Sequence, residues 1–531
     1  MNRQDIQLLA AARAGDADAH VRAGTAYLLG SGSFPRHLRS GIEHLTHPSV
    51  AGRTDALASL CAHLSVVELL ESGLLPLLQK AAAQGIDIAT EKLALWWLTQ
   101  PAQRRGGLQM LRVLAARTGS GMLAGPQGVG DEAERARAIF WSMSRAGRFD
   151  GAATLRLAWR AALGESGTAG VDADRVECAL CWCLALLSSA DAKTQDGLAS
   201  EVVASLEWLE DLGVHLHGLP VAIAERLLTA AAERADARAC FRLGRALAGL
   251  PCGAMSPESL SRERNLRRGT ALLLRAADAG RVQAWMLLHA LAADHRCSVA
   301  NPQMARFFLE KAAQGGIAEA QRRLGVLLLR EARSLEDSET AIAWLHLARE
   351  QGDALAARVL ASLVLPVPGA DADAVLALRA LRAVDPALAA RLSLARHFGL
   401  TRTEALVVDP AGGERPWGLV VGPIAHLRQP RLAAPRAVPA ADAHALRCLR
   451  ESAELFMREP RERLDGEGAV RTRTRSLRTL LDRHGIAESL FFAPATGQVL
   501  DSLRRGSRWA VRAGTLVQAA LTPGSESAIC A

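Results

Sequence analysis

The stretch Glu310–Gly325, which reads EKAAQGGIAEAQRRLG, decides the fold of this chain. A similar stretch, LRAADAGRVQAWMLLH, begins 36 residues earlier at Leu274. The glycines keep this distance at Gly280, Gly316 and Gly352, and alanines repeat with them at Ala276, Ala312, Ala348, Ala284, Ala320 and Ala356. A fixed period of this length indicates that one supersecondary unit is repeated along the chain.

The chemistry of one unit predicts a pair of helices. In TAIAWLHLAREQGDALAARVLA, the apolar residues Ala341, Trp344 and Ala348 recur at steps of three and four, as on one face of a helix. Gly352 is expected to end this helix in the left-handed conformation, and Asp353 to cap the next one. A single helix pair cannot bury its apolar face, so we expect the pairs to stack into a solenoid.

Weaker copies of the unit extend the repeat toward the N-terminus. They are centred on Gly15, Gly52, Gly85, Gly119 and Gly147, and on Ala235, which replaces the glycine. We therefore predict about ten units between residues 1 and 360, with an ambiguous repeat register at 185–220. A chain of 531 residues, half of them hydrophobic but only 4% aromatic, fits an extended array of helices better than one compact core.

The units resemble the Sel-one-like repeat, a relative of the tetratricopeptide repeat. The segment GPQGVGDEAERARAIFWSMSRAG supplies the residues of that pattern in order, at Gly125, Gly128, Val129, Asp131, Ala138, Trp141 and Gly147. The resemblance covers about two-thirds of the chain and is most specific at 268–360. It implies an all-α, right-handed α/α superhelix that serves as a scaffold for protein complexes, often in bacterial signalling or envelope-linked regulation.

The composition changes after residue 362, where LVLPVPGADAD interrupts the repeat. We predict a repeat solenoid at 1–362, a helical cap at 363–400 and a small mixed α and β module of unrecognised family at 401–531. Within the cap and module, we predict helices at 371–384, 386–398, 440–458 and 469–483, a β-hairpin at 404–422, an irregular proline-rich loop at 423–439 and a strand at 508–521.

The tightest cluster of possible metal ligands is formed by Cys178, Cys181 and Cys183. Zinc ligands usually come from loops and from a second Cys or His pair, whereas these cysteines flank an apolar helical stretch. We interpret them as core residues. His215 and His217 have no further ligand nearby in the sequence and are interpreted as solvated. We therefore expect no metal and no cofactor.

No sequence motif of an enzyme is recognised, so no catalytic residue is assigned. Gly125, Gly128 and Gly130 are not followed by the Lys-Ser or Lys-Thr of a phosphate-binding loop, and no strand precedes them. The glycine–serine stretches GSGSF and GESG lack the strand–turn–helix context of a nucleophile elbow.

The clearest candidate for partner binding is the stretch RTRTRSLR at 471–478. On a helix, Arg471, Arg475 and Arg478 share one face and leucines form another. Residues 401–531 contain 19 Arg and 14 acidic residues, about +5 of the net charge of +8. This face could bind phosphate or an acidic partner, although the aromatic residues of a single-strand binder are missing, and a solvated basic face is the simpler interpretation.

These observations predict a non-enzymatic protein–protein interaction scaffold or adaptor that assembles or regulates a bacterial complex. Two alternatives stay open: a catalytic or ligand-sensing unit at 401–531 that the repeats target, and an Arg-rich nucleic-acid-binding element. The N-terminus shows no signal peptide and no stretch is apolar enough for a membrane span, so we expect a cytoplasmic protein. The partner and the oligomeric state are not specified by the sequence.

Overall fold

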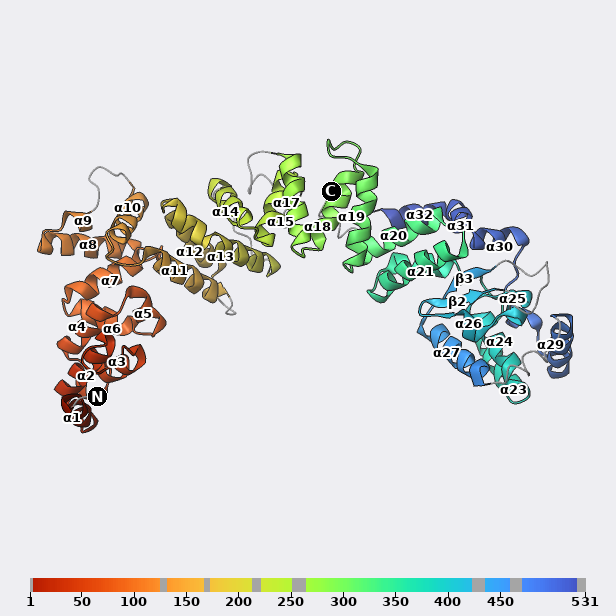
Figure 1. Cartoon of the computed structure of the whole chain (residues 1–531), viewed down its shortest axis with the longest axis horizontal. Coiled ribbons are helices and arrows are strands. Elements are labelled where there is room, and N and C mark those ends of the chain that lie inside the picture. The colour runs from red at the N-terminus through yellow and green to blue at the C-terminus, as the bar shows by residue number, and fades with distance from the viewer. Residues whose placement is uncertain are drawn as a thin grey trace. The chain divides into compact units, whose positions relative to one another are not determined.

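A computed structural model describes residues 3–124, 131–166, 172–212, 221–250, 264–422, 435–458 and 470–522. The chain divides into two units, residues 1–265 and 266–531. Helices dominate both units, and within each unit consecutive helices pack side by side (Figure 1). The predicted class, an all-α repeat solenoid with a small C-terminal sheet, is confirmed.

Residues 1–265 contain only helices in their described part. These are α1 (Arg3–Arg13), α2 (Ala17–Leu29), α3 (Leu38–Leu45), a 3-10 helix η1 (Pro48–Val50), α4 (Thr54–His63), α5 (Val66–Glu71), α6 (Leu75–Ala83), α7 (Asp87–Trp97), α8 (Arg104–Thr118), α9 (Gly121–Ala124), α10 (Glu132–Arg145), α11 (Gly151–Ser166), α12 (Ala173–Ser188), α13 (Ala192–Asp211), α14 (Val221–Glu233) and α15 (Ala237–Leu247).

The second unit begins with further helix pairs. Its helices up to residue 397 are α17 (Leu266–Asp278), α18 (Gln283–Ala293), α19 (Pro302–Gln314), α20 (Ala318–Glu331), α21 (Leu335–Glu350), α22 (Ala354–Ser362), α23 (Asp371–Arg382) and α24 (Pro386–His397). The two helices predicted for the cap correspond to α23 and α24.

The repeated glycine ends a helix in the left-handed conformation, as the sequence predicts. Gly280, Gly316 and Gly352 have φ angles of +93°, +88° and +89°, and the glycines of the weaker copies also have positive φ. Ala235, which replaces the glycine, adopts φ +62° and is the one non-glycine residue in the described part with positive φ. Asp353 then caps α22, since its carboxylate accepts a hydrogen bond from the backbone N–H of Ala356 at 2.9 Å. The 36-residue period of the sequence therefore marks the points where one helix ends and the next begins.

A second repeated glycine lets neighbouring helices approach closely. Gly24 and Gly325 lie nine residues after the left-handed glycine of their units. A Cβ atom on Gly24 would lie 2.6 Å from Cγ of Leu45, and one on Gly325 would lie 2.7 Å from Cγ of Leu345. Both distances are shorter than any van der Waals contact, so a larger residue would push α3 away from α2, or α21 away from α20.

The C-terminal elements combine helices with a small antiparallel sheet. They are α25 (Arg402–Val407), α26 (Pro410–Gly413), β1 (Glu414–Arg415), β2 (Gly418–Val421), β3 (Arg436–Pro439), α27 (Ala443–Arg458), α29 (Val470–His484), the 3-10 helix η2 (Glu488–Leu490), α30 (Gly497–Arg504), α31 (Gly506–Arg512) and α32 (Gly514–Leu521). The strand order is β1-β2-β3, and β3 pairs with β2 from Gly418 opposite Pro439 to Val421 opposite Arg436.

The helices predicted at 440–458 and 469–483 are present as α27 and α29, but two local predictions for this region are wrong, those of the hairpin and of the proline-rich loop. The first apolar run of the expected hairpin forms α25, because Thr401 and Glu404 make a capping box that starts a helix. The hairpin itself is shorter and joins β1 to β2. The proline-rich segment, expected to be irregular, ends in the buried strand β3.

The strand expected at 508–521 is also wrong, because this segment forms α31 and α32. Its buried residues Trp509, Val517 and Ala520 follow helical rather than alternating spacing, and they pack against α20 and α22. These apolar contacts favour a helix over the strand predicted from the sequence.

One core joins the cap helices to the C-terminal elements. Phe398 at the end of α24, Leu419 in β2 and Leu477 in α29 are all fully buried in it. Next to this core, Arg436 and Glu404 form a buried ion pair, with side chains that are 0% and 2% exposed and an Nε–Oε1 distance of 2.7 Å. The division at 1–362, 363–400 and 401–531 stays a prediction, and within the second unit α23 and α24 share their core with the following module.

Candidate functional site

A hollow of about 480 Å³ lies on the first unit, between helices of different repeats. We call it the α11 hollow. Its lining comes from α5, α11 and α13, through Val67, Glu71, Ala153, Arg156, Leu157, Arg160 and Glu201. Apolar and charged side chains thus converge on one surface.

Two guanidinium groups of the α11 hollow share one carboxylate. Arg156 donates from Nε to Oε2 of Glu201 at 2.6 Å, and Arg160 donates from Nε to Oε1 at 3.0 Å. The side chains of Arg156, Arg160 and Glu201 are 37%, 60% and 30% exposed. Each guanidinium has five N–H donors, and in the described residues the ion pairs of these two arginines are with Glu201 alone, which leaves most of the donors without a carboxylate.

Local sequence rules position these three charged residues. Asp150 caps α11 by accepting a hydrogen bond from the N–H of Ala153 at 2.9 Å, and Asp191 caps α13 in the same way. Arg156 follows the left-handed Gly147 by nine residues, the position that is glycine in the units of Gly24 and Gly325. Arg160 lies one helical turn later, so both guanidiniums point from the same face of α11.

The predicted arginine face is present on α29. Arg471, Arg475 and Arg478 are all exposed, whereas Leu477 and Leu481 are buried in the core on the other side of the helix. Arg473, between them, is buried and donates from a terminal nitrogen to the carbonyl oxygen of Leu406 at 2.8 Å. One arginine of the stretch therefore holds α29 against α25, and the role of the other three in binding stays a prediction.

The cysteine cluster on α12 is divided between core and surface. Cys183 is buried, and burial raises the pKa of its thiol to about 12. Cys181 is half-buried, whereas Cys178 is exposed, so the core interpretation is wrong for Cys178, which lies on the outer side of α12. In the described residues these cysteines do not form part of a three-ligand group. His215, His217 and the glycines Gly125, Gly128 and Gly130 lie outside the described residues.

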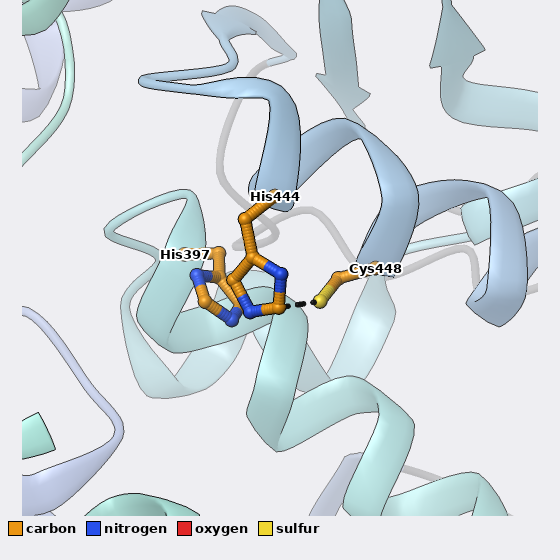
Figure 2. A group of neighbouring side chains, drawn as sticks. All are labelled: His397, His444 and Cys448. Carbon is orange, nitrogen blue, oxygen red and sulfur yellow. Dashed lines mark hydrogen bonds between the residues drawn. The ribbon is translucent and has the colours of Figure 1, made fainter. Parts of the chain in front are cut away.

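The sequence analysis missed a group of possible metal ligands in the second unit. His397, His444 and Cys448, which we call the His397 cluster, come together from α24 and α27 (Figure 2). Their ligand atoms all lie within 4.8 Å of one another. The only local signal in the sequence is the four-residue spacing of His444 and Cys448, which places both side chains on one face of a helix.

No helix in the described part of the chain is long and apolar enough to cross a membrane. No disulfide bond joins the seven cysteines that the structure describes.

The chain is similar to solved structures of repeat proteins. A protective antigen present in uropathogenic Escherichia coli strains, which displays an SLR fold, is 20% identical with a TM-score of 0.29, over 68% of this chain and 75% of that one. A Sel1 repeat protein from Oxalobacter formigenes is 20% identical with a TM-score of 0.26, over 68% of this chain and 91% of that one. Both are Sel1 repeat (SLR-fold) proteins, the family that the repeats resemble. No protein-family model and no curated protein matches the chain.

Proposed function

We propose that this protein is a non-enzymatic scaffold that assembles or regulates a bacterial protein complex, and that the α11 hollow binds an acidic segment of a partner protein. The observation that carries the proposal is the pair of guanidiniums that share the carboxylate of Glu201 in an open hollow. A cytoplasmic location is part of the proposal, because cysteines without disulfide bonds, as in the described residues, are typical of a reducing compartment.

The chemistry of the hollow selects the partner. The lining carries two positive charges, on Arg156 and Arg160, and two carboxylates, that of Glu201 between the guanidiniums and that of Glu71 on α5. A carboxylate from a partner would accept hydrogen bonds from the N–H donors that Glu201 does not use, because guanidinium groups favour planar, bidentate contacts with carboxylates. Val67, Ala153 and Leu157 supply apolar surface for the rest of the segment. The occupant is therefore an Asp- or Glu-containing stretch with apolar neighbours.

The size of the hollow also fits a peptide segment better than a whole domain. A volume of about 480 Å³ holds a few side chains. In a larger interface the hollow would form the central pocket, and the neighbouring helices of the solenoid would supply the surrounding contact area. Arginine is enriched in such central pockets because its flat guanidinium packs and donates at once.

Quantitative affinity capture from native lysate tests the proposal, with three forms of the full chain as bait. The double variant Arg156→Gln/Arg160→Gln should lose its principal partner, since removing one side of a desolvated charge pair costs about 2 kcal/mol or more, equivalent to more than tenfold in affinity. The variant Glu201→Gln should retain more of the same partner, because it frees both guanidiniums from their internal carboxylate.

A matched control uses two other surface arginines of the same unit. Arg39 on α3 and Arg112 on α8 are exposed and lie outside the hollow, so Arg39→Gln/Arg112→Gln makes the same change in net charge. It should capture the same proteins as the wild type. Equal losses from both double variants, or no loss from either, would contradict a binding role for the hollow.

A further inference from the structure

We propose that His397, His444 and Cys448 bind a divalent transition-metal ion, with zinc as the natural occupant. The proposal is independent of the α11 hollow, which belongs to the other unit of the chain. It departs from the expectation of no metal drawn from the sequence, which rested on Cys178, Cys181, Cys183 and the two histidines at 215 and 217.

The geometry of the His397 cluster is close to that of a tetrahedral site. Zinc bonds of about 2.0–2.1 Å to nitrogen and 2.3 Å to sulfur, at tetrahedral angles, place ligand atoms about 3.3–3.6 Å apart. The Sγ atom of Cys448 lies 3.7 Å from Nε2 of His444. The imidazole rings of His397 and His444 have centroids 4.8 Å apart and stand nearly perpendicular, at 86°. The ligand atoms lie within 4.8 Å of one another, so side-chain rotations that shorten the longest separation by about 1.2–1.5 Å bring all three to one ion.

The backbone that carries the ligands is well fixed. His397 is the last residue of α24, and the next residue, Phe398, is fully buried in the core that includes Leu449 of α27. His444 and Cys448 lie one turn apart near the start of α27, where Asp442 accepts a hydrogen bond from the N–H of Ala445 at 2.8 Å. Figure 2 shows the ring of His444 between the ring of His397 and the thiol of Cys448, with the contact between His444 and Cys448 dashed. Two packed helices thus present the ligands, as a metal site requires.

The donor set decides the class of ion. Two imidazoles and one thiolate suit zinc and related transition metals, whereas calcium and magnesium need oxygen ligands. Three protein ligands leave the fourth tetrahedral position to a water molecule, and the exposure of His444 gives solvent access to it. Binding releases one proton, because the Cys448 thiol is replaced by a metal–thiolate bond.

A reactive Cys–His pair is the other chemistry that these residues could support. A nucleophilic cysteine needs a thiol pKa near or below neutral, usually lowered by a nearby cation. Burial instead raises the pKa of Cys448, and burial together with the charge of His444 lowers the pKa of His397. A thiol with a raised pKa is a poorer nucleophile than an ordinary cysteine.

Cobalt(II) is the probe for this site, because it occupies zinc sites and reports its ligands optically. Titration into the metal-free full-length protein should give one cobalt per chain, with a thiolate-to-cobalt charge-transfer band and the visible bands of tetrahedral cobalt. Zinc should displace both. Cys448→Ser should abolish the charge-transfer band, and His444→Gln should weaken cobalt binding at least tenfold. Because His444 is exposed, its replacement leaves the core intact and the circular dichroism of the metal-free protein unchanged.

Cys178→Ser is the matched control, since Cys178 is an exposed helical thiol outside the cluster. It should bind cobalt as the wild type does. The proposal is overturned if no charge-transfer band forms, if the band persists in Cys448→Ser, or if His444→Gln binds cobalt with unchanged affinity.

Discussion

Replacing Gly316 by valine should destabilise the helix pair α19 and α20 by about 1–2 kcal/mol. Gly316 has φ +88°, and an L-residue in the left-handed region costs about 1–2 kcal/mol, more when it is β-branched. A Cβ atom at this position would meet no atom within 4 Å, so no packing clash adds to the cost. A side chain also lowers the conformational entropy of the unfolded chain, which offsets part of this cost by about 0.4–1 kcal/mol. Alanine should cost less than valine, because it is not β-branched.

Urea denaturation of the full-length protein, followed by far-ultraviolet circular dichroism, measures the change in the free energy of unfolding. A solenoid can unfold in parts, so hydrogen exchange of α19 and α20 should be followed as well, and protection should fall there first. Gly497, the first residue of α30, is the matched control, because a Cβ there also meets open space and its φ is not positive. Gly497→Ala should leave stability unchanged or raise it. A Gly316→Val protein as stable as the wild type would refute the left-handed helix end as the origin of the repeat.

Three further predictions follow from the same structure. Ala235→Gly should stabilise the protein by about 0.5–1 kcal/mol in urea denaturation, because it relieves a left-handed alanine, and a loss of stability would contradict this. Burial and the charge of nearby histidines lower the pKa of His20 and of His44, whose Nδ1 atoms are 2.9 Å apart. The unfolded chain then takes up more protons, so the melting temperature of the first unit should fall as pH drops below about 6.5, and His44→Gln should weaken that dependence. Glu404→Gln should destabilise the second unit by about 3–5 kcal/mol in urea, because it leaves Arg436 buried without its counter-charge, and a loss below about 1 kcal/mol would contradict the importance of the pair.

The repeat could be predicted from the sequence because its determinants are local. A left-handed glycine and an aspartate cap act within one turn of the helix end, so their spacing alone locates Gly280, Gly316 and Gly352. The same local rules also predict the start of α25, because Thr401 and Glu404 form the Thr-x-x-Glu pattern of a capping box. The sequence analysis did not apply them there and predicted a hairpin instead.

The long-range features could not be predicted in the same way. The α11 hollow takes Val67, Arg156 and Glu201 from three separate stretches of the chain, and no period links them. The His397 cluster joins the end of one helix to the start of another across 47 residues, and the sequence analysis assigned those helices to different domains. Such sites depend on how helices pack, which propensity and spacing do not specify.

The Arg436–Glu404 ion pair is another long-range contact that could not be predicted from the sequence. Its arginine lies in a proline-rich segment, where composition favours an exposed loop. In the structure it is fully buried in β3, and it also donates to the carbonyl oxygen of Gly399 at 3.0 Å. Burial raises the pKa of Glu404, but the hydrogen bonds and charge of Arg436, helped by Thr401, bring the net pKa below its ordinary value. The carboxylate is therefore charged in the folded protein.

The most direct test of the scaffold function is site-specific photo-crosslinking from within the α11 hollow in living cells. A photoreactive side chain at Leu157, which lines the hollow, is compared with one at Val113, which is 60% exposed on α8 outside it. The account predicts a discrete adduct with another protein from position 157 and none of the same mass from position 113. No adduct from position 157, or the same adducts from both positions, would contradict the assignment of the hollow as the binding site of a partner protein.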